Sequence, residues 1–282
     1  MIGQVYKVQT DTFVVKSEDK IVLCNSRGLI KKCGDGVLVG DIVTVENGVI
    51  TKVHQRKNRF IRPSVCNVDL IVVLISPEPK PDFYLVDKVL VNAIKENVDV
   101  LFVVNKTDFD DSLYQQVVDE YKHLEIDIVK ISAKTKAGVE ELKQRLKGKL
   151  SVFVGQSAVG KTSLVNSMFD LDLKTGELSG IGRGKHTTTR SEIFENQDIK
   201  VVDSPGFAVI DAEVTAEEFP LYYEEYFEVS NDCRFRGCRH IDEPNCKVKE
   251  LVEKGFFSKS RYDRYVEIYL ELQKRRKIYE RN

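Results

Sequence analysis

The chain has 282 residues, of which 42% are hydrophobic and 31% are charged, and its formal net charge is −1. This is the composition of an ordinary soluble protein, and the sequence has no apolar run of the length that crosses a membrane. The first residues, MIGQVYKVQTDTF, lack the basic and then apolar plan of a signal peptide. We therefore expect a cytoplasmic protein with no membrane partner.

The charge is distributed unevenly along the chain. Residues 1–63 contain 11 Lys and Arg against 6 Asp and Glu (+5), residues 64–221 contain 18 against 26 (−8), and residues 222–282 contain 14 against 12 (+2). Basic ends around an acidic middle suit terminal modules that approach a polyanion. Surface charge that serves only solubility explains the uneven net charges of the three segments equally well.

The N-terminal module is predicted to be a small barrel. Apolar alternation between turn signals predicts five short strands, at 3–9, 12–17, 20–26, 36–46 and 48–55. So many strands in so few residues indicate a closed barrel of the OB type. A basic, proline-containing linker follows at 54–65, and we place this module, an RNA-binding OB-fold, at residues 1–63.

The middle of the chain changes to strand–helix alternation. Near-continuous apolar runs at 68–75 and 98–105 are typical of parallel strands covered on both faces, and 82–97 has helical spacing between them. The alternation predicts a three-layer α/β domain over residues 64–221. Residues 190–203 interrupt it as an antiparallel hairpin turning at Asn196 and Gln197.

The last module, residues 222–282, begins with a cluster of cysteines and continues as an amphipathic helix from about Ser260. The three remaining cysteines are scattered, and we expect them to be ordinary core or surface thiols. They are Cys24, Cys33 and Cys66.

The stretch GQSAVGKT matches the phosphate-loop pattern G-x-x-x-x-G-K-[ST], after an apolar strand and at the start of a helix. Gly155 and Gly160 allow the backbone to fold around phosphate, and the helix N-terminus faces the anion. Lys161 would reach the β- and γ-phosphates, and the Thr162 hydroxyl would bind Mg²⁺. The predicted phosphate-binding residues are Gly155, Gln156, Ser157, Ala158, Val159, Gly160, Lys161, Thr162 and Ser163.

Two further motifs follow predicted strands and indicate guanine recognition. In NKTD, the Asp108 carboxylate can accept hydrogen bonds from guanine N1–H and N2–H₂ together, which adenine does not offer. Asn105 would brace neighbouring loops, and the Lys106 stem would cover the base. In SAK, the Ala133 amide would meet guanine O6. The predicted base-binding residues are Asn105, Lys106, Thr107, Asp108, Ser132, Ala133 and Lys134.

The stretches GKHTTTR and DSPGF resemble switch segments. Thr188 or Thr189 would bind Mg²⁺ in the triphosphate state, Asp203 would hold Mg²⁺ through water, and the Gly206 amide would sense the γ-phosphate. Together with Lys161, Gly206 is a predicted catalytic residue.

The residue after the DSPG glycine predicts slow intrinsic hydrolysis. Phe207 stands where Ras-like proteins have a glutamine that positions water, and it has no group that could do so. His186 is a candidate substitute, because imidazole can polarise water near neutral pH. A solvent-facing loop histidine is the alternative.

The pattern C-x₄-C-x-H-x₅-C brings Cys233, Cys238, His240 and Cys246 within fourteen residues. Three thiolates and an imidazole suit one closed, tetrahedral and structural Zn²⁺ site. A set of incidental thiols is the alternative reading. Basic residues beside this cluster and in the linker are candidates for RNA phosphate contacts. They are Arg56, Lys57, Arg59, Arg62, Arg234, Arg236 and Arg239, with the KRRK run at 274–277 as an addition.

The motifs occur in the order NKTD, SAK, phosphate loop, threonine segment, DSPG, whereas the usual order puts the last three first. Joining the old ends of an ordinary GTPase and cutting it after DSPG produces this order. With the barrel and the cysteine cluster, it resembles the circularly permuted small-subunit ribosome biogenesis GTPases of the RsgA (YjeQ/YloQ) family over essentially the whole chain. In that family the phosphate loop usually has Gly and Ser where this chain has Ala158 and Thr162.

The resemblance implies an OB barrel, a permuted GTPase domain and a C-terminal zinc domain. It also implies a GTP hydrolase that binds GTP with Mg²⁺, releases GDP and phosphate, and is stimulated by the small (30S) ribosomal subunit during late maturation. We expect the protein to be a monomer and to have the 16S rRNA of that subunit as a partner. Two alternatives remain open. One is a GTP-regulated binding module in which hydrolysis is incidental, and the other is a GTPase of metabolism or membranes whose barrel binds protein.

Overall fold

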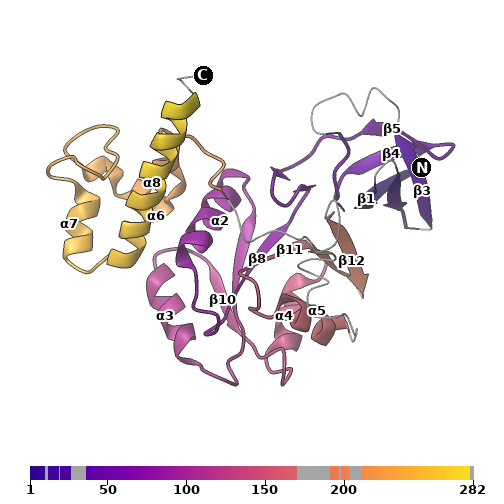
Figure 1. Cartoon of the computed structure of the whole chain (residues 1–282), viewed down its shortest axis with the longest axis horizontal. Helices are drawn as coiled ribbons and strands as arrows, with labels where there is room; N and C mark the ends of the chain where they lie inside the picture. Colours follow the sequence, from indigo (N-terminus) through magenta and orange to yellow (C-terminus); the bar gives the residue numbers. More distant parts are fainter. Residues whose placement is uncertain are drawn as a thin grey trace.

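The computed structural model describes residues 1–9, 12–18, 20–26, 36–169, 191–196, 198–203 and 211–279. Three parts lie in a row: a strand-rich part that holds the N-terminus, a central α/β part, and a helical part that holds the C-terminus (Figure 1).

The strand-rich part is a closed five-stranded barrel, as the sequence predicted. Neighbouring strands pair in the order β1-β2-β3-β5-β4, and β4 pairs back with β1 to close the barrel. Alternate apolar side chains fill its interior, among them Val5, Val15, Val43 and Ile50. The strands are β1 (Ile2–Val8), β2 (Phe13–Lys16), β3 (Ile21–Ser26), β4 (Ile42–Glu46) and β5 (Val49–Val53).

The segment predicted as a linker is tied to the barrel. It contains a short antiparallel pair, β6 (Arg59–Phe60) and β7 (Val65–Cys66). The guanidinium of Arg56 makes two contacts with the buried carboxylate of Asp41, at 2.7 and 2.8 Å, and donates to the Gly36 carbonyl at 2.7 Å. Arg56 therefore holds the end of the barrel against the linker.

The central part is a three-layer α/β domain, as predicted. Its parallel strands have the order β10-β9-β8-β11-β13, and β12 pairs antiparallel with β13 as the expected hairpin. The strands are β8 (Leu70–Ile75), β9 (Asp99–Val104), β10 (Asp127–Lys130), β11 (Leu150–Val154), β12 (Glu192–Asn196) and β13 (Ile199–Asp203).

Helices cover both faces of this sheet because successive strand residues point to opposite sides. On β8, Ile71 and Val73 face a core with α2 (Phe83–Lys95) and α3 (Ser112–Tyr121). Val72 and Leu74 face a second core with the two remaining helices. Those helices are α4 (Val139–Leu146) and α5 (Lys161–Phe169).

The barrel and the central sheet are continuous through one strand pair. β1 pairs antiparallel with β12, with Lys7 opposite Glu192, so that eleven strands form one sheet. Three side-chain contacts reinforce the pair: Lys7 with Glu192, and both Tyr6 and Lys16 with Glu195. The barrel is thus attached to the hairpin that follows the threonine-rich segment.

The helical part is built around aromatic rings. Tyr223, Tyr226 and Tyr265 are almost fully buried, and the ring of Phe219 stacks on Tyr265 with a centroid distance of 5.1 Å. This core also includes Val91 of α2, which anchors it to the central part. Its elements are η1 (Phe219–Tyr222), α6 (Glu224–Glu228), η2 (Ser230–Asp232), α7 (Lys247–Glu253) and α8 (Lys259–Tyr279).

A buried charge network holds α8 on α2. Asp87 is fully buried and accepts from Arg261 and Arg264, each at 2.5 Å, and from the Tyr121 hydroxyl at 2.9 Å. Arg261 also contacts Glu225 of α6. Burial raises the pKa of Asp87, and the two guanidinium groups oppose that rise. A buried carboxylate is tolerated here because its partners satisfy both oxygens.

We expect Asp87→Asn to lower the free energy of unfolding by about 3–5 kcal/mol, because the buried Arg261 and the half-buried Arg264 would lose their shared counter-charge. Urea unfolding followed by tyrosine fluorescence measures the change. The control is Asp263→Asn, which breaks an exposed pair with Lys259 on the same helix and should cost about 0–1 kcal/mol. Equal costs in the two variants would contradict a structural role for the network.

Candidate functional site

The predicted nucleotide motifs meet at one edge of the central sheet. The phosphate loop leaves β11, NKTD leaves β9 and SAK follows β10, and all three strands run parallel. Ligands of open α/β sheets bind outside the carboxyl ends of the strands. A cavity of about 520 Å³ lies at the other edge, where Asp99 and Asp127 begin their strands, and it contains none of the motif residues.

The phosphate loop depends on two glycines. At Gly155 a Cβ would lie 2.4 Å from the Leu74 carbonyl oxygen, and at Gly160, where φ is +101°, it would lie 2.4 Å from the Asn105 side-chain nitrogen. Ala158 has a φ of +66°, a left-handed conformation that an L side chain disfavours. Ala158 therefore adopts a backbone conformation that glycine adopts more readily.

The charged and hydroxyl groups of the loop lie at the start of α5. The Lys161 ammonium donates to the carbonyls of Gly155 and Gln156, both at 2.6 Å, so the lysine curls back over its own loop. Thr162 is buried in the first turn of the helix. Ser157 is exposed at the tip of the loop and Ser163 is exposed one residue further along α5.

Asn105 joins the three loops. Its side-chain nitrogen donates to the Val159 carbonyl at 2.9 Å, and its side-chain oxygen accepts from the Ala133 amide at 3.0 Å. Asn105 is buried, so these bonds are shielded from water. One amide thus connects NKTD to both the phosphate loop and SAK.

The rest of NKTD is also connected to its neighbours. The Ser132 hydroxyl donates to Asp108 at 2.7 Å, which orients the carboxylate predicted to read guanine. Lys106, at a φ of +63°, donates to the Ala158 carbonyl at 2.9 Å and to the Glu78 carbonyl. Thr107 donates to the Ile131 carbonyl at 3.0 Å, and Lys134 is exposed beside the motif.

A brace of the phosphate loop was not predicted from the sequence. The Gln156 side chain accepts from the Asp82 amide at 3.0 Å and donates to the Lys80 carbonyl at 3.1 Å. Asp82 also caps α2 through the Leu85 amide. The phosphate loop is thereby tied to the start of the helix that carries Asp87.

Most of the predicted switch residues lie outside the described residues. These are His186, Thr188, Thr189, Gly206 and Phe207. Asp203 is the last residue of β13, which runs parallel to β11, so its backbone lies at the nucleotide edge.

The residues that follow DSPGF, the second switch segment, contact both α2 and α8. Asn92 of α2 donates to the Asp211 carbonyl at 2.9 Å and accepts from the Glu213 amide at 2.8 Å. Arg275 of α8 contacts the Asp211 carboxylate at 2.6 Å. The exit from this switch segment therefore touches both the central part and the C-terminal helix.

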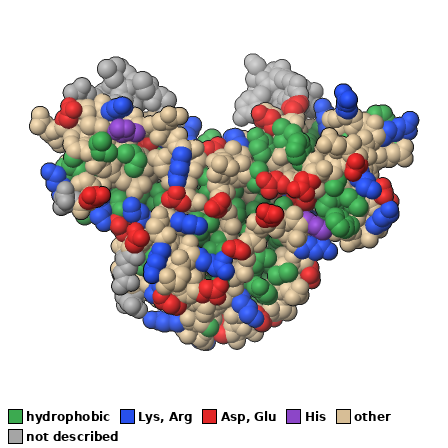
Figure 2. Space-filling model, turned by 180° about the vertical axis from the view of Figure 1, so that it is seen from behind, with side chains coloured by type: hydrophobic (Ala, Val, Ile, Leu, Met, Phe, Trp, Pro, Cys, Tyr) green, Lys and Arg blue, Asp and Glu red, His purple; other side chains and the backbone are tan. Residues whose placement is uncertain are grey.

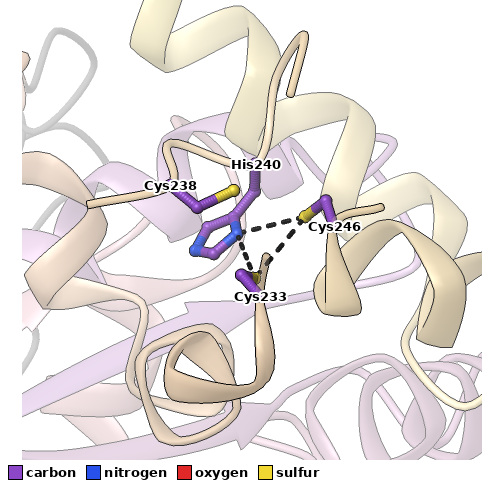
Figure 3. Close-up of side chains that lie close together, drawn as sticks. All are labelled: Cys233, Cys238, His240 and Cys246. Carbon is purple, nitrogen blue, oxygen red and sulfur yellow. Dashed lines mark hydrogen bonds between the residues drawn. The ribbon is translucent and has the colours of Figure 1, made fainter. Parts of the chain in front are cut away.

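The predicted metal ligands converge. The ligand atoms of Cys233, Cys238, His240 and Cys246 all lie within 4.8 Å of one another, and Figure 3 shows them pointing to a common centre. The His240 Nδ1 is 3.3 Å from the Cys246 sulfur and 3.7 Å from the Cys233 sulfur. Cys233 follows η2 and Cys246 precedes α7, so the ends of two short helices define the site.

The chemistry of this cluster fits a metal ion. Burial lowers the pKa of His240 to about 4, which keeps the imidazole neutral and able to bind metal. Burial and neighbouring thiols raise the pKa of Cys238 to about 12, and a cation would remove the cost of charging them. The Tyr262 and Tyr265 hydroxyls each donate at 2.7 Å to the carbonyls of His240 and Arg239, which fixes the ligand loop.

The predicted RNA-contacting residues fall into two groups. In the linker, the Arg56 guanidinium is paired with Asp41, and its predicted contact with RNA phosphate stays a prediction. Lys57 contacts Asp69, Arg59 is half-buried and Arg62 is exposed. In the metal module the three arginines are all exposed. They are Arg234, Arg236 and Arg239.

On the face that Figure 2 presents, Lys and Arg side chains are mixed with those of Asp and Glu. Among the residues that the structure describes, no helix combines the length and apolar character needed to cross a bilayer.

This arrangement defines a circularly permuted guanine-nucleotide-binding protein with an added barrel and metal-ligand cluster. A model of the family described as RsgA GTPase matches residues 53–213. The protein named small ribosomal subunit biogenesis GTPase RsgA from Geobacillus sp. (strain WCH70) is 38% identical, with 98% of this chain and 99% of the relative covered.

Solved structures agree with this match. The crystal structure of YjeQ from Thermotoga maritima superposes with a TM-score of 0.80 at 36% identity, covering 96% of this chain and 98% of that one. YloQ, described as a circularly permuted GTPase, superposes with a TM-score of 0.78 at 28% identity, covering 97% and 95%. The chain belongs to the RsgA GTPase family and is a GTP hydrolase.

We expect Gly155→Ala to weaken GDP binding about 5- to 150-fold, because overpacking against the rigid Leu74 carbonyl costs about 1–3 kcal/mol. Titration with a fluorescent GDP analogue measures the affinity. Gly148→Ala is the control: φ is +70° but the nearest atom is 3.9 Å away, so it should cost stability and leave GDP affinity unchanged. Unchanged affinity in Gly155→Ala would refute the role of this contact.

We expect one metal ion per chain in the native protein, and its loss on replacing Cys246 with Ser. Native mass spectrometry measures the metal, and the near-ultraviolet circular dichroism of the buried tyrosines should weaken with it because the ligand loop would no longer be held. Cys24→Ala, in the barrel, is the matched control and should keep the metal. A metal-free native protein with an intact aromatic signal would argue against the site.

Proposed function

We propose that this GTPase binds the small ribosomal subunit and its 16S rRNA and assists late maturation of that subunit. The relatives that match nearly the whole chain are named for small ribosomal subunit biogenesis. The observation that carries the nucleotide part of the proposal is Asn105, whose amide holds the base-reading and phosphate-binding loops together.

In this proposal GTP lies across NKTD, SAK and the phosphate loop. Asp108 accepts from guanine, Lys161 leaves its loop carbonyls to contact the β- and γ-phosphates, and the loop amides surround them. Mg²⁺ would be held by Thr162, by Thr188 or Thr189, and through water by Asp203. The ion supplies charge neutralisation, and the residues of the chain supply position and orientation.

The metal cluster would hold one structural Zn²⁺. Four ligands from thiolates and a neutral imidazole form the closed tetrahedral set that zinc prefers, and all four side chains are needed to complete it. The proposed modules are the barrel and linker at 1–63, the GTPase domain at 64–221 and the zinc module at 222–282. The exposed arginines of the last module and Lys57, Arg59 and Arg62 of the first would contact rRNA phosphate.

One feature favours a second candidate, a GTP-regulated binding module with incidental turnover. Phe207 has no group that can orient water, so intrinsic hydrolysis should be slow. Stimulation by the subunit distinguishes the two functions, because only the first requires hydrolysis to respond to the partner.

We expect purified small subunits to raise GTP turnover about tenfold or more. We expect His186→Ala to reduce the stimulated rate about 10²-fold, as loss of a general base does, with GDP affinity unchanged. Phosphate release measures the rate. The matched control is His123→Ala, because the His123 ring packs against Phe256 of the C-terminal part. Turnover that does not respond to small subunits would favour the binding module. A full rate in His186→Ala would remove this histidine from the mechanism.

A further inference from the structure

Two of the candidate metal ligands, Cys233 and Cys238, stand at the two ends of a four-residue loop. Arg234, Phe235, Arg236 and Gly237 lie between the ligands Cys233 and Cys238. The Arg234 amide donates to the Asn245 carbonyl at 3.4 Å, and Gly237 turns the chain at a φ of +69°. A loop held at both ends loses little conformational entropy when it binds, which favours recognition.

This loop exposes an aromatic ring. Phe235 is 42% exposed, whereas Tyr226 and Tyr265 of the same module are buried in its core; Phe227 and Phe256 are also exposed, at 51% and 49%. The Arg234 guanidinium lies 5.5 Å from the centre of the Phe235 ring. A single exposed apolar residue is ordinary on a protein surface, so the exposure matters only together with its charged neighbours.

The neighbouring arginines are available for a partner. Arg234, Arg236 and Arg239 are exposed, and within the described part of the chain none of them has a carboxylate at ion-pair distance. Other arginines, such as Arg261, are paired with carboxylates. Glu243, one of the acids near these arginines in the chain, accepts from the backbone amides of Arg239 at 2.9 Å and Ile241 at 3.1 Å. The Glu243 carboxylate is therefore hydrogen-bonded to backbone amides beside His240.

We propose that Phe235 is a stacking platform for an unpaired RNA base, with Arg234 and Arg236 contacting the phosphates on either side of that base. Single-stranded RNA offers the two features that this loop complements, a flat base and closely spaced negative charge. An acidic protein surface would satisfy the arginines but would leave the ring without a partner. The inference rests on the proposed binding to 16S rRNA and names the contact within it.

The experiment uses the full-length, metal-loaded protein and purified small subunits, with metal content measured for every variant. Phe235→Ala should weaken binding about 5- to 100-fold, the range for loss of one stacked base. Because it removes no charge, the dependence of affinity on salt should stay the same. Arg236→Gln should instead reduce the slope of that dependence by about 0.7, the value for one phosphate contact on a single strand.

Two further variants separate stacking from apolar contact. Phe235→Leu keeps an apolar side chain and should bind as weakly as Phe235→Ala. Phe235→Trp should retain affinity, and because the chain contains no other tryptophan its fluorescence reports on this position alone. A stacked base should quench that fluorescence when small subunits or 16S rRNA are added.

The outcomes are distinguishable. Wild-type protein that does not bind small subunits would overturn the proposed function. Wild-type binding with full affinity in Phe235→Ala would overturn the stacking inference alone. Full affinity in Phe235→Leu would also overturn the stacking inference. So would quenching of the Phe235→Trp fluorescence by small subunits but not by 16S rRNA, because the ring would then contact protein.

Discussion

The nucleotide edge of this protein depends on the side chain of Asn105. The phosphate loop and the SAK motif leave separate strands, and nothing in the covalent chain holds them at a fixed separation. The buried amide of Asn105 does so by donating to one loop and accepting from the other. Gly160 makes this possible, because a Cβ there would lie only 2.4 Å from the Asn105 side-chain nitrogen. The base-reading and phosphate-binding halves of the site are thereby one unit.

The permuted order of the motifs determines which elements connect the barrel and the C-terminal module to the nucleotide site. The barrel is attached through β12, the strand that follows the threonine-rich segment, and the C-terminal module is attached through α2 and the residues that follow the second switch segment. α2 in turn is capped by Asp82, whose amide donates to Gln156 of the phosphate loop. Each flanking module is therefore connected to a different part of the nucleotide site.

Much of the fold could be predicted from the sequence because its signals are local. Turn residues between alternating strands indicated the barrel, continuous apolar runs indicated covered parallel strands, and the spacing of four ligands indicated the metal cluster. The linker was harder to predict, since Arg56 reads as an exposed basic residue until its partner Asp41 is known. The same holds for Asp87, which has the appearance of an ordinary polar position on a helix. Gln156 was assigned to the phosphate loop for its backbone, and its side-chain contacts were not foreseen.

The sequence by itself determined the order of the motifs, the kind of nucleotide they suit and the four candidate metal ligands, because each of these depends on residue type and short spacing. Only the tertiary structure decided which charges are available to a partner. Arg56 and Arg261 are paired with buried carboxylates distant in sequence, whereas Arg234 and Arg236 are held out on the ligand loop beside Phe235. The physical reason is that burial and pairing are long-range properties, since a charged side chain is satisfied by whatever the fold brings within a few ångströms of it.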